Sequence, residues 1–195
     1  MARKNGFTLI ELLIAIAIIG LVTAIAVPQW QSLRRRTAVR AAAAEIRAIF
    51  RAARSRAITR GANAGVKFTR SGNDWQYAIY DDGDGDGIRN DDIQSGVDRR
   101  VTALRYACRG PELASIALLP SVKRDPDGDP ILGGASPVQF NRSTICSFSP
   151  LGQATPGTIY LADSGDQEYA VRVLGGTARV RLLRYDAKSR RWEDK

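Results

Sequence analysis

The chain has 195 residues, with 29 lysines and arginines against 20 aspartates and glutamates, and a formal net charge of +9. It contains no histidine, which excludes histidine-based catalytic triads and most catalytic zinc sites. No nucleophile, metal-hydrolase or phosphate-loop motif stands out, so we expect a protein that is not an enzyme, with one N-terminal anchor and one globular domain.

The N-terminal region holds an apolar run, residues 7–27, in which Glu11 is the sole ionisable residue. As a helix it is about 30 Å long, enough to cross a bilayer once. The run could be a plain transmembrane anchor, or a secretory signal peptide that starts with Arg3 and Lys4. The length of the run and its glutamate both disfavour a signal peptide. Because a carboxylate in lipid needs a partner, Glu11 is a candidate functional residue.

A third interpretation comes from the residues that open the run. They are Gly6-Phe7-Thr8-Leu9-Ile10-Glu11-Leu12-Leu13, after a short basic leader. This order closely resembles the leader of type IV pilins and type II secretion pseudopilins. The resemblance implies cleavage after Gly6 by a prepilin peptidase and methylation of the new amino terminus on Phe7. It also implies a long helix that packs into a filament core, with Pro28 where pilins commonly have a helix-kinking proline.

Electrostatics supports an assembly role for Glu11. An amine and a carboxylate attract each other far more strongly in a low-dielectric medium than in water. Glu11 could therefore neutralise the Phe7 amine of its own or a neighbouring chain and fix the axial register. No other charged residue of the run competes for it.

The leader resemblance also predicts the compartment and the domain boundaries. We expect a leader over 1–6, a transmembrane helix over 7–28, an amphipathic helix over 29–60 and a periplasmic β-rich domain over 61–195, held by the bacterial inner membrane. Four arginines after the apolar run would favour a cytoplasmic domain by the positive-inside rule; they are Arg34, Arg35, Arg36 and Arg40. We give the leader more weight.

The amphipathic helix is predicted from apolar residues at three- and four-residue spacing. This stripe consists of Val39, Ala42, Ala43, Ile46, Ile49, Phe50, Ala53 and Ala57. Arginines fall together on the adjoining face: Arg36, Arg40, Arg47, Arg51 and Arg54. Gly61 offers a helix stop. We expect the stripe to pack on a sheet.

After Gly61 the pattern changes to short β-branched or aromatic runs separated by Gly, Pro, Asp and Asn. The predicted strands are 65–69, 75–80, 101–106, 113–119, 138–140, 144–148, 158–162, 169–174 and 178–183. A long helix followed by many strands indicates an α+β fold: a pilin-like long N-terminal helix packed on an antiparallel β-sheet head.

Residues 82–93 resemble the start of a calcium loop. Asp82, Asp84 and Asp86 supply carboxylates at positions 1, 3 and 5, and glycine occupies position 6. Position 12, where a bidentate acid is expected, is Ile93, so Asp91 or Asp92 would have to substitute. The alternative is an acidic hairpin loop with no bound ion. Calcium is the one cofactor that the sequence suggests, whereas the acidic segment 125–130 is expected to be an exposed loop.

The two cysteines, Cys108 and Cys146, could form a disulfide in an oxidising periplasm or remain buried thiols. No spacing rule pairs them, so both alternatives stay open.

The C-terminal third resembles the GspH/FimT group of minor pseudopilins and minor pilins. Its motifs are Phe148-Ser149-Pro150-Leu151-Gly152, Gly157-Thr158-Ile159-Tyr160-Leu161, Val171-Arg172-Val173 and Ala178-Arg179-Val180-Arg181. The usual Gly-Arg pair before the last strand is Ala178-Arg179 here, with the glycines displaced upstream to 175 and 176.

Arginines gather in the same C-terminal region, at Arg172, Arg179, Arg181, Arg184, Arg190 and Arg191. A DNA-uptake pilin would use Arg179 and Arg181 to hold phosphates. The alternatives are a solvated strand face, or ion pairs with a neighbouring subunit's acids.

The resemblances imply a minor pseudopilin of a type II secretion system, near the tip of a periplasmic filament for protein export. The alternative is a minor pilin of a type IV pilus, including a DNA-binding variant for uptake. The implied partners are the prepilin peptidase, other major and minor pseudopilins, inner-membrane lipid, and the secretin or exported protein. Nucleic acid is the less favoured partner.

Overall fold

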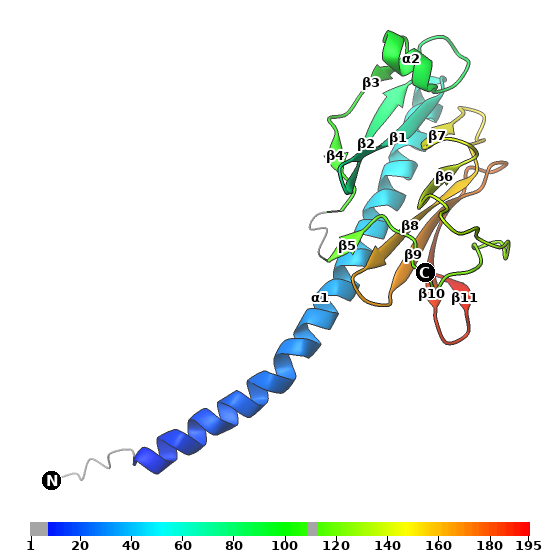
Figure 1. The fold of residues 1–195 in the computed structure, drawn as a ribbon. Helices are drawn as coiled ribbons and strands as arrows, with labels where there is room; N and C mark the ends of the chain where they lie inside the picture. Colours follow the sequence, from blue (N-terminus) through cyan, green and yellow to red (C-terminus); the bar gives the residue numbers. More distant parts are fainter. Residues whose placement is uncertain (1–7, 109–112) are drawn as a thin grey trace.

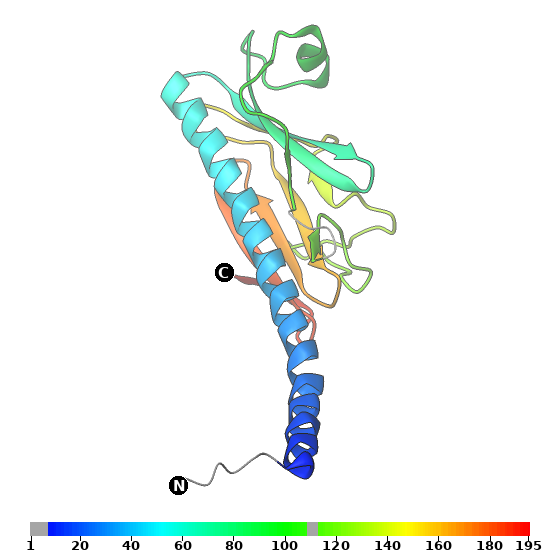
Figure 2. The same cartoon turned by 90° about the vertical axis from the view of Figure 1, so that its left-hand side faces the viewer.

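A computed structural model of the protein describes residues 8–108 and 113–195. They form a long helix, α1 (Leu9–Arg60), then strands in two antiparallel sheets and a short helix, α2 (Asn90–Ser95). The C-terminal half of α1 lies along the sheets, and its N-terminal half projects beyond them (Figures 1 and 2). The predicted pilin-like α+β fold is confirmed.

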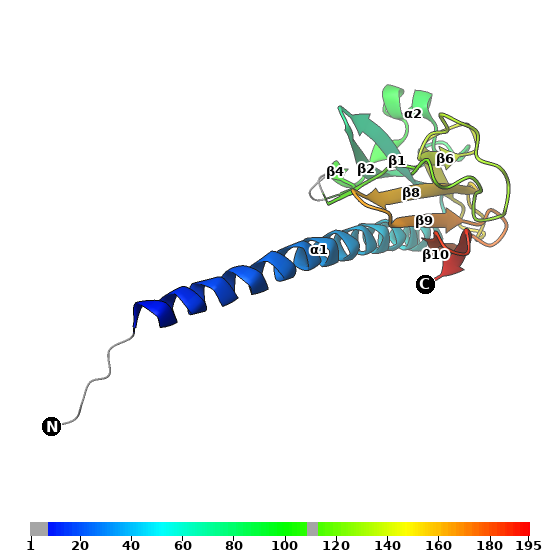
Figure 3. The same ribbon diagram turned by 60° about the horizontal axis from the view of Figure 1, so that its bottom comes forward.

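Helix α1 is 52 residues long, which corresponds to about 78 Å. It begins after Thr8, whose side chain caps the first turn, and it ends at Gly61, which adopts a left-handed conformation with φ of 67°. Pro28 lies inside the helix, which continues through it and curves gently (Figure 3). Over the described residues, the predicted apolar and amphipathic segments are therefore parts of one helix, which continues past Pro28 as expected.

The first sheet has the strand order β3-β2-β1-β7, and β4 also pairs with β2. Its strands are β1 (Ala64–Ser71), β2 (Asp74–Asp81), β3 (Arg99–Arg100), β4 (Arg105–Tyr106) and β7 (Ile145–Phe148). β1 and β2 form a hairpin that runs directly off the end of α1. The acidic loop thus begins at the far end of β2, close to the C-terminus of α1.

The second sheet has the order β11-β10-β9-β8-β5, and β6 also pairs with β8. Its strands are β5 (Ala114–Ser115), β6 (Val138–Phe140), β8 (Gly157–Asp163), β9 (Glu168–Val173), β10 (Val180–Asp186) and β11 (Arg191–Asp194). Gly157 sits where β8 meets β6; a Cβ there would lie 2.1 Å from the Gln139 carbonyl oxygen. Only glycine fits this crossing of backbones.

One core joins α1 to both sheets, and Phe50 lies at its centre. Its ring is 5.9 Å from that of Phe68 on β1, 6.1 Å from that of Phe148 on β7 and 5.6 Å from that of Phe140 on β6. The predicted apolar stripe of α1 is buried here except for Ile49, which is half-buried. Helix burial against the two sheets therefore holds the head together.

Several elements differ from the prediction. Of the predicted strand 101–106, only residues 105–106 are strand, and a separate two-residue strand lies at 99–100. Of the predicted strand 113–119, the described strand covers only residues 114–115. Helix α2 and strand β11 were not predicted. These segments are short and polar, so their hydrophobic period is too weak to identify them.

Glu168, at the start of β9, is an unexpected buried acid. Its side chain is 0% exposed, and its Oε2 accepts a hydrogen bond from the Leu119 backbone N–H at 3.2 Å. Its Oε1 is shielded and has no hydrogen-bond partner among the residues that the structure describes. Burial raises the pKa of Glu168 to about 8. The carboxyl group is therefore largely protonated in the folded protein at neutral pH.

Candidate functional site

The N-terminal half of α1 presents an apolar surface that nothing in the described chain covers. Its large side chains are exposed, for example Leu9 at 78% and Leu21 at 66%. An 18-residue window of this helix is apolar enough to cross a membrane, with none of the window buried against the rest of the protein. The head does not use this half of α1, so it is available to lipid or to other helices.

Glu11 occupies the first turn of that helix as part of a capping box with Thr8. Its Oε2 accepts hydrogen bonds from the Thr8 backbone N–H at 2.9 Å and from the Thr8 hydroxyl at 2.8 Å. The Thr8 hydroxyl in turn accepts from the Glu11 N–H at 3.3 Å. The carboxylate is thus held beside the chain that leads to Phe7. The predicted cleavage and methylation residues, Gly6 and Phe7, lie outside the described residues.

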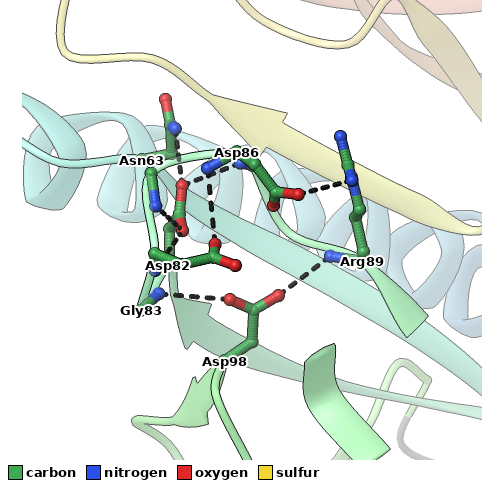
Figure 4. A network of polar contacts seen from close by, with 9 residues as sticks. Asn63, Asp82, Gly83, Asp86, Arg89 and Asp98 are labelled. Carbon is green, nitrogen blue, oxygen red and sulfur yellow. Dashed lines mark hydrogen bonds and ion pairs between the residues drawn. The ribbon is translucent and has the colours of Figure 1, made fainter. Parts of the chain in front are cut away.

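The acidic loop after β2 is organised around two aspartates of low exposure, Asp82 and Asp98 (Figure 4). The Asp82 carboxylate accepts hydrogen bonds from Asn63 Nδ2 at 2.6 Å and from the backbone N–H groups of residues 84, 85 and 87. Asp98 accepts from the N–H groups of Gly83 and Arg89 at 3.2 and 2.9 Å. Burial acts to raise the pKa of Asp82, but the Asn63 and backbone hydrogen bonds outweigh it and lower that pKa.

The predicted cation ligands do come together. Ligand oxygens of Asp82, Asp84 and Asp86 lie within 4.8 Å of one another. Asp86 also forms an ion pair with Arg89. Its pKa is raised by desolvation and by the nearby Asp84. Asp84 and Asp86 are exposed, whereas the Asp82 carboxylate already accepts four hydrogen bonds. Carboxylate oxygens are the ligands that a hard cation prefers.

A second polar network anchors this loop to α1. Asp81, at the end of β2, accepts hydrogen bonds from Arg56 Nε at 2.6 Å and Arg56 Nη2 at 2.8 Å, and it also pairs with Arg60. The Arg56 hydrogen bonds hold the pKa of Asp81 below its usual range. The fork-like contact fixes the end of α1 against the base of the loop.

The C-terminal arginines divide into two groups. Arg172 is half-buried, donates to Thr158 Oγ1 at 2.8 Å and pairs with Asp127, while Arg184 pairs with Glu193 at 3.2 Å. Arg179, together with Arg181, which pairs with Asp194 at 3.1 Å, lines a groove of about 310 Å³. The groove's other arginines come from α1: Arg47, Arg51 and Arg54. We call this surface the arginine groove.

The structure separates the two cysteines. Cys146 is buried on β7, with its Sγ 3.7 Å from the Thr155 carbonyl oxygen, and Cys108 follows β4. Strands β1 and β2 lie between β7 and β4. Three strand spacings amount to about 14 Å, whereas a disulfide needs Cα atoms roughly 4.4–6.8 Å apart. The disulfide considered from the sequence is therefore not formed here, and both residues are free thiols.

Sequence reasoning placed the arginines of α1 and those of β10 in separate groups. The predicted helix face already contained Arg47, Arg51 and Arg54, but nothing in the sequence shows which strand lies beside that face. Glu168 was also missed, because its neighbours along the chain are ordinary strand residues. Both features arise from contacts between distant segments.

Comparisons with known proteins give one match for the N-terminal residues and another for the part of the chain that includes the head. Residues 1–27 match the prokaryotic N-terminal methylation motif, and residues 42–177 match the family described as type II transport protein GspH. Two proteins of Pseudomonas aeruginosa, each described as fimbrial protein, are 51% identical over 55 residues, 28% of this chain and 36% of each relative. The chain thus matches about a third of the length of these relatives. No solved structure gives a significant match.

Proposed function

Because the chain belongs to the type II transport protein GspH family, we propose that it is a minor pseudopilin of a type II secretion system. It acts as a structural subunit of a periplasmic filament for protein export. The observation that carries the proposal is the uncovered apolar half of α1, which begins with a single carboxylate at Glu11. Such a helix stays in the inner membrane before assembly and packs among other helices afterwards.

The proposed assembly step uses Glu11 as the partner of a neighbouring amine. Cleavage after Gly6 frees the amino group of Phe7, which is methylated and remains positively charged. In this structure the Glu11 carboxylate is satisfied by Thr8, and those hydrogen bonds keep it at the end of the helix. Amine and carboxylate then pair in the low-dielectric helix bundle, where the attraction is strongest.

The proposed topology places the head in the periplasm. The prepilin peptidase processes the leader, and major and minor pseudopilins are the neighbours in the filament. The head, which lies beyond the membrane helix, contacts other minor subunits, the secretin or the exported protein. No catalytic step is proposed.

The test of this function is a Glu11→Ala variant in cells that carry the native assembly machinery. We expect normal membrane levels but loss of the subunit from filaments and reduced export. The matched control is Glu45→Gln, which changes another α1 glutamate, one that accepts a hydrogen bond from the Tyr77 hydroxyl at 2.9 Å within the head. Unchanged assembly in Glu11→Ala would contradict the role of Glu11, and an intact Met1 by mass spectrometry would contradict processing.

The second candidate is a minor pilin of a type IV pilus, including one that binds DNA for uptake. The similarity to fimbrial proteins and the arginines at 179 and 181 favour it. Deletion separates the two functions: loss of an exported protein supports secretion, and loss of pili or transformation supports the pilus. Filter binding of duplex DNA at low salt tests the DNA-binding variant, which depends on phosphate contacts.

We also propose that the acidic loop binds calcium through Asp82, Asp84 and Asp86. The clustering of their oxygens within 4.8 Å supports this. Calorimetric titration of the full chain in detergent should give calcium heat that Asp84→Asn with Asp86→Asn abolishes, and Asp166→Asn on the β8–β9 loop should leave it unchanged. No heat with the native chain, together with no shift in melting temperature, would refute the proposal.

A further inference from the structure

The arginine groove lies between the C-terminal half of α1 and the start of β10. Arg47, Arg51 and Arg54 are spaced three and four residues apart and so share one helix face. Arg179, just before β10, and Arg181, on β10, line the same groove. The fold thus brings five guanidinium groups, from segments more than 120 residues apart, to one hollow.

The groove has too few acids to balance these charges. Within the described residues, Arg181 Nε pairs with Asp194 at 3.1 Å, and Arg47 donates to the Lys195 carbonyl oxygen at 3.4 Å. No described acid pairs with Arg51 or Arg179 within 4 Å, although both line the groove. Their charges are not neutralised within the described residues, so the groove is complementary to an anion.

We propose that the arginine groove docks an acidic segment of a neighbouring pilin-like subunit. The proposal rests on the proposed function, since it requires that the chain assemble with other subunits. Guanidinium groups form paired hydrogen bonds with carboxylates. Several aspartates or glutamates on one short segment would pair with Arg51 and Arg179 together and orient the two heads.

Membrane phosphates are too distant to be the ligand. Twenty residues of helix separate Val27, at the end of the apolar run, from Arg47, a distance of about 30 Å. Headgroups extend only about 5–8 Å beyond the hydrocarbon, and screening limits their field to roughly another 8 Å. The groove therefore lies outside the reach of lipid charge.

A neighbouring subunit is the source that the helix geometry favours over nucleic acid. Because α1 is continuous, bundling the N-terminal halves of several subunits also draws their C-terminal halves together. Unneutralised arginines on α1 would repel like surfaces, and acids from the neighbour remove that repulsion. The two aromatic residues near the C-terminal arginines, Tyr185 and Trp192, pack on each other with ring centroids 5.2 Å apart.

The test measures binding of a fluorescent hexa-aspartate peptide to the full chain in neutral detergent. We expect salt-sensitive binding that weakens at least tenfold in the double variant Arg51→Ala with Arg179→Ala. The control is Arg99→Ala with Arg100→Ala, which removes two exposed arginines of β3 at a distance from the groove and should change binding less than twofold. Equal losses in both variants, or no binding, would overturn the proposal.

A competition arm separates the two macromolecules. A short DNA duplex should displace the peptide poorly at 150 mM salt; efficient displacement that disappears in the groove variant would assign the surface to nucleic acid instead. In cells, Arg51→Glu with Arg179→Glu should lower incorporation into filaments while leaving membrane levels unchanged. If Glu11→Ala assembles normally but the peptide still binds the groove, the assembly mechanism fails and the groove chemistry stands.

Discussion

Replacing the buried acid on β9, Glu168→Gln, should stabilise the head at neutral and alkaline pH. The folded pKa of Glu168 is about 8 against an ordinary 4.5. The folded state therefore holds a proton that the unfolded chain releases above pH 4.5, and stability falls as pH rises from there to about 8. At 1.36 kcal/mol for each pH unit, the loss is about 3 kcal/mol at pH 7 and at most about 5 above pH 8.

Glutamine resembles the neutral acid: it keeps an oxygen for the Leu119 N–H but cannot ionise. For a chain of this size about 1 kcal/mol shifts the melting temperature by roughly 2–4 °C, so the variant should melt about 6–12 °C higher near pH 7 and at nearly the same temperature at pH 4.5. Circular dichroism melts of the full chain in detergent between pH 4.5 and 9 measure this. Parallel curves for the two proteins at all pH values would refute the reasoning.

Three further predictions concern the head. Phe50→Ala should lower the free energy of unfolding by about 3–5 kcal/mol, because it empties the centre of the aromatic cluster; denaturant unfolding would show it. Arg56→Ala should cost about 1–2 kcal/mol at pH 7, since a partly exposed partner is lost from Asp81. This loss of stability should disappear below about pH 4, where the Asp81 carboxylate becomes protonated and its ion pair no longer stabilises the fold. The lowered pKa of Asp81 determines how far below this pH the protonation occurs. Gly157→Ala should destabilise the β6–β8 crossing through contact with the Gln139 carbonyl, giving a lower melting temperature, whereas Gly176→Ala, with open space around it, should not.

Most of the fold could be predicted from local sequence patterns. The stripe from Val39 to Ala57 has a strong helical period, and it identified the packed face of α1 before any contact was known. The strands 65–69 and 75–80 were predicted from their local residue patterns, and in the structure they lie within β1 and β2, which pair as a hairpin. The pairing of β7 with β1 did not follow, because it joins residues about eighty positions apart and no local pattern encodes such a partner.

The candidate functional residues also fall into those that the sequence predicts and those that only the structure shows. Glu11 stands in one short motif, beside Gly6 and Phe7, and the aspartates 82, 84 and 86 form another. Each motif lies within a few consecutive residues, so the sequence alone was enough to find it. The arginine groove depends on β10 lying beside α1, and the buried state of Glu168 depends on the segment at Leu119 covering β9. Tertiary contacts create both features, and a one-dimensional pattern does not contain them.

The unbroken course of α1 through Pro28 has a mechanical consequence. From Val27 to Phe50 the helix spans about 35 Å, and no loop interrupts it. A tilt of about 10° at the membrane end would move the centre of the head by roughly 6 Å if the rod stays stiff. Within the described chain, no hinge separates the head from the N-terminal half of α1. A rotation of that N-terminal half therefore displaces the head.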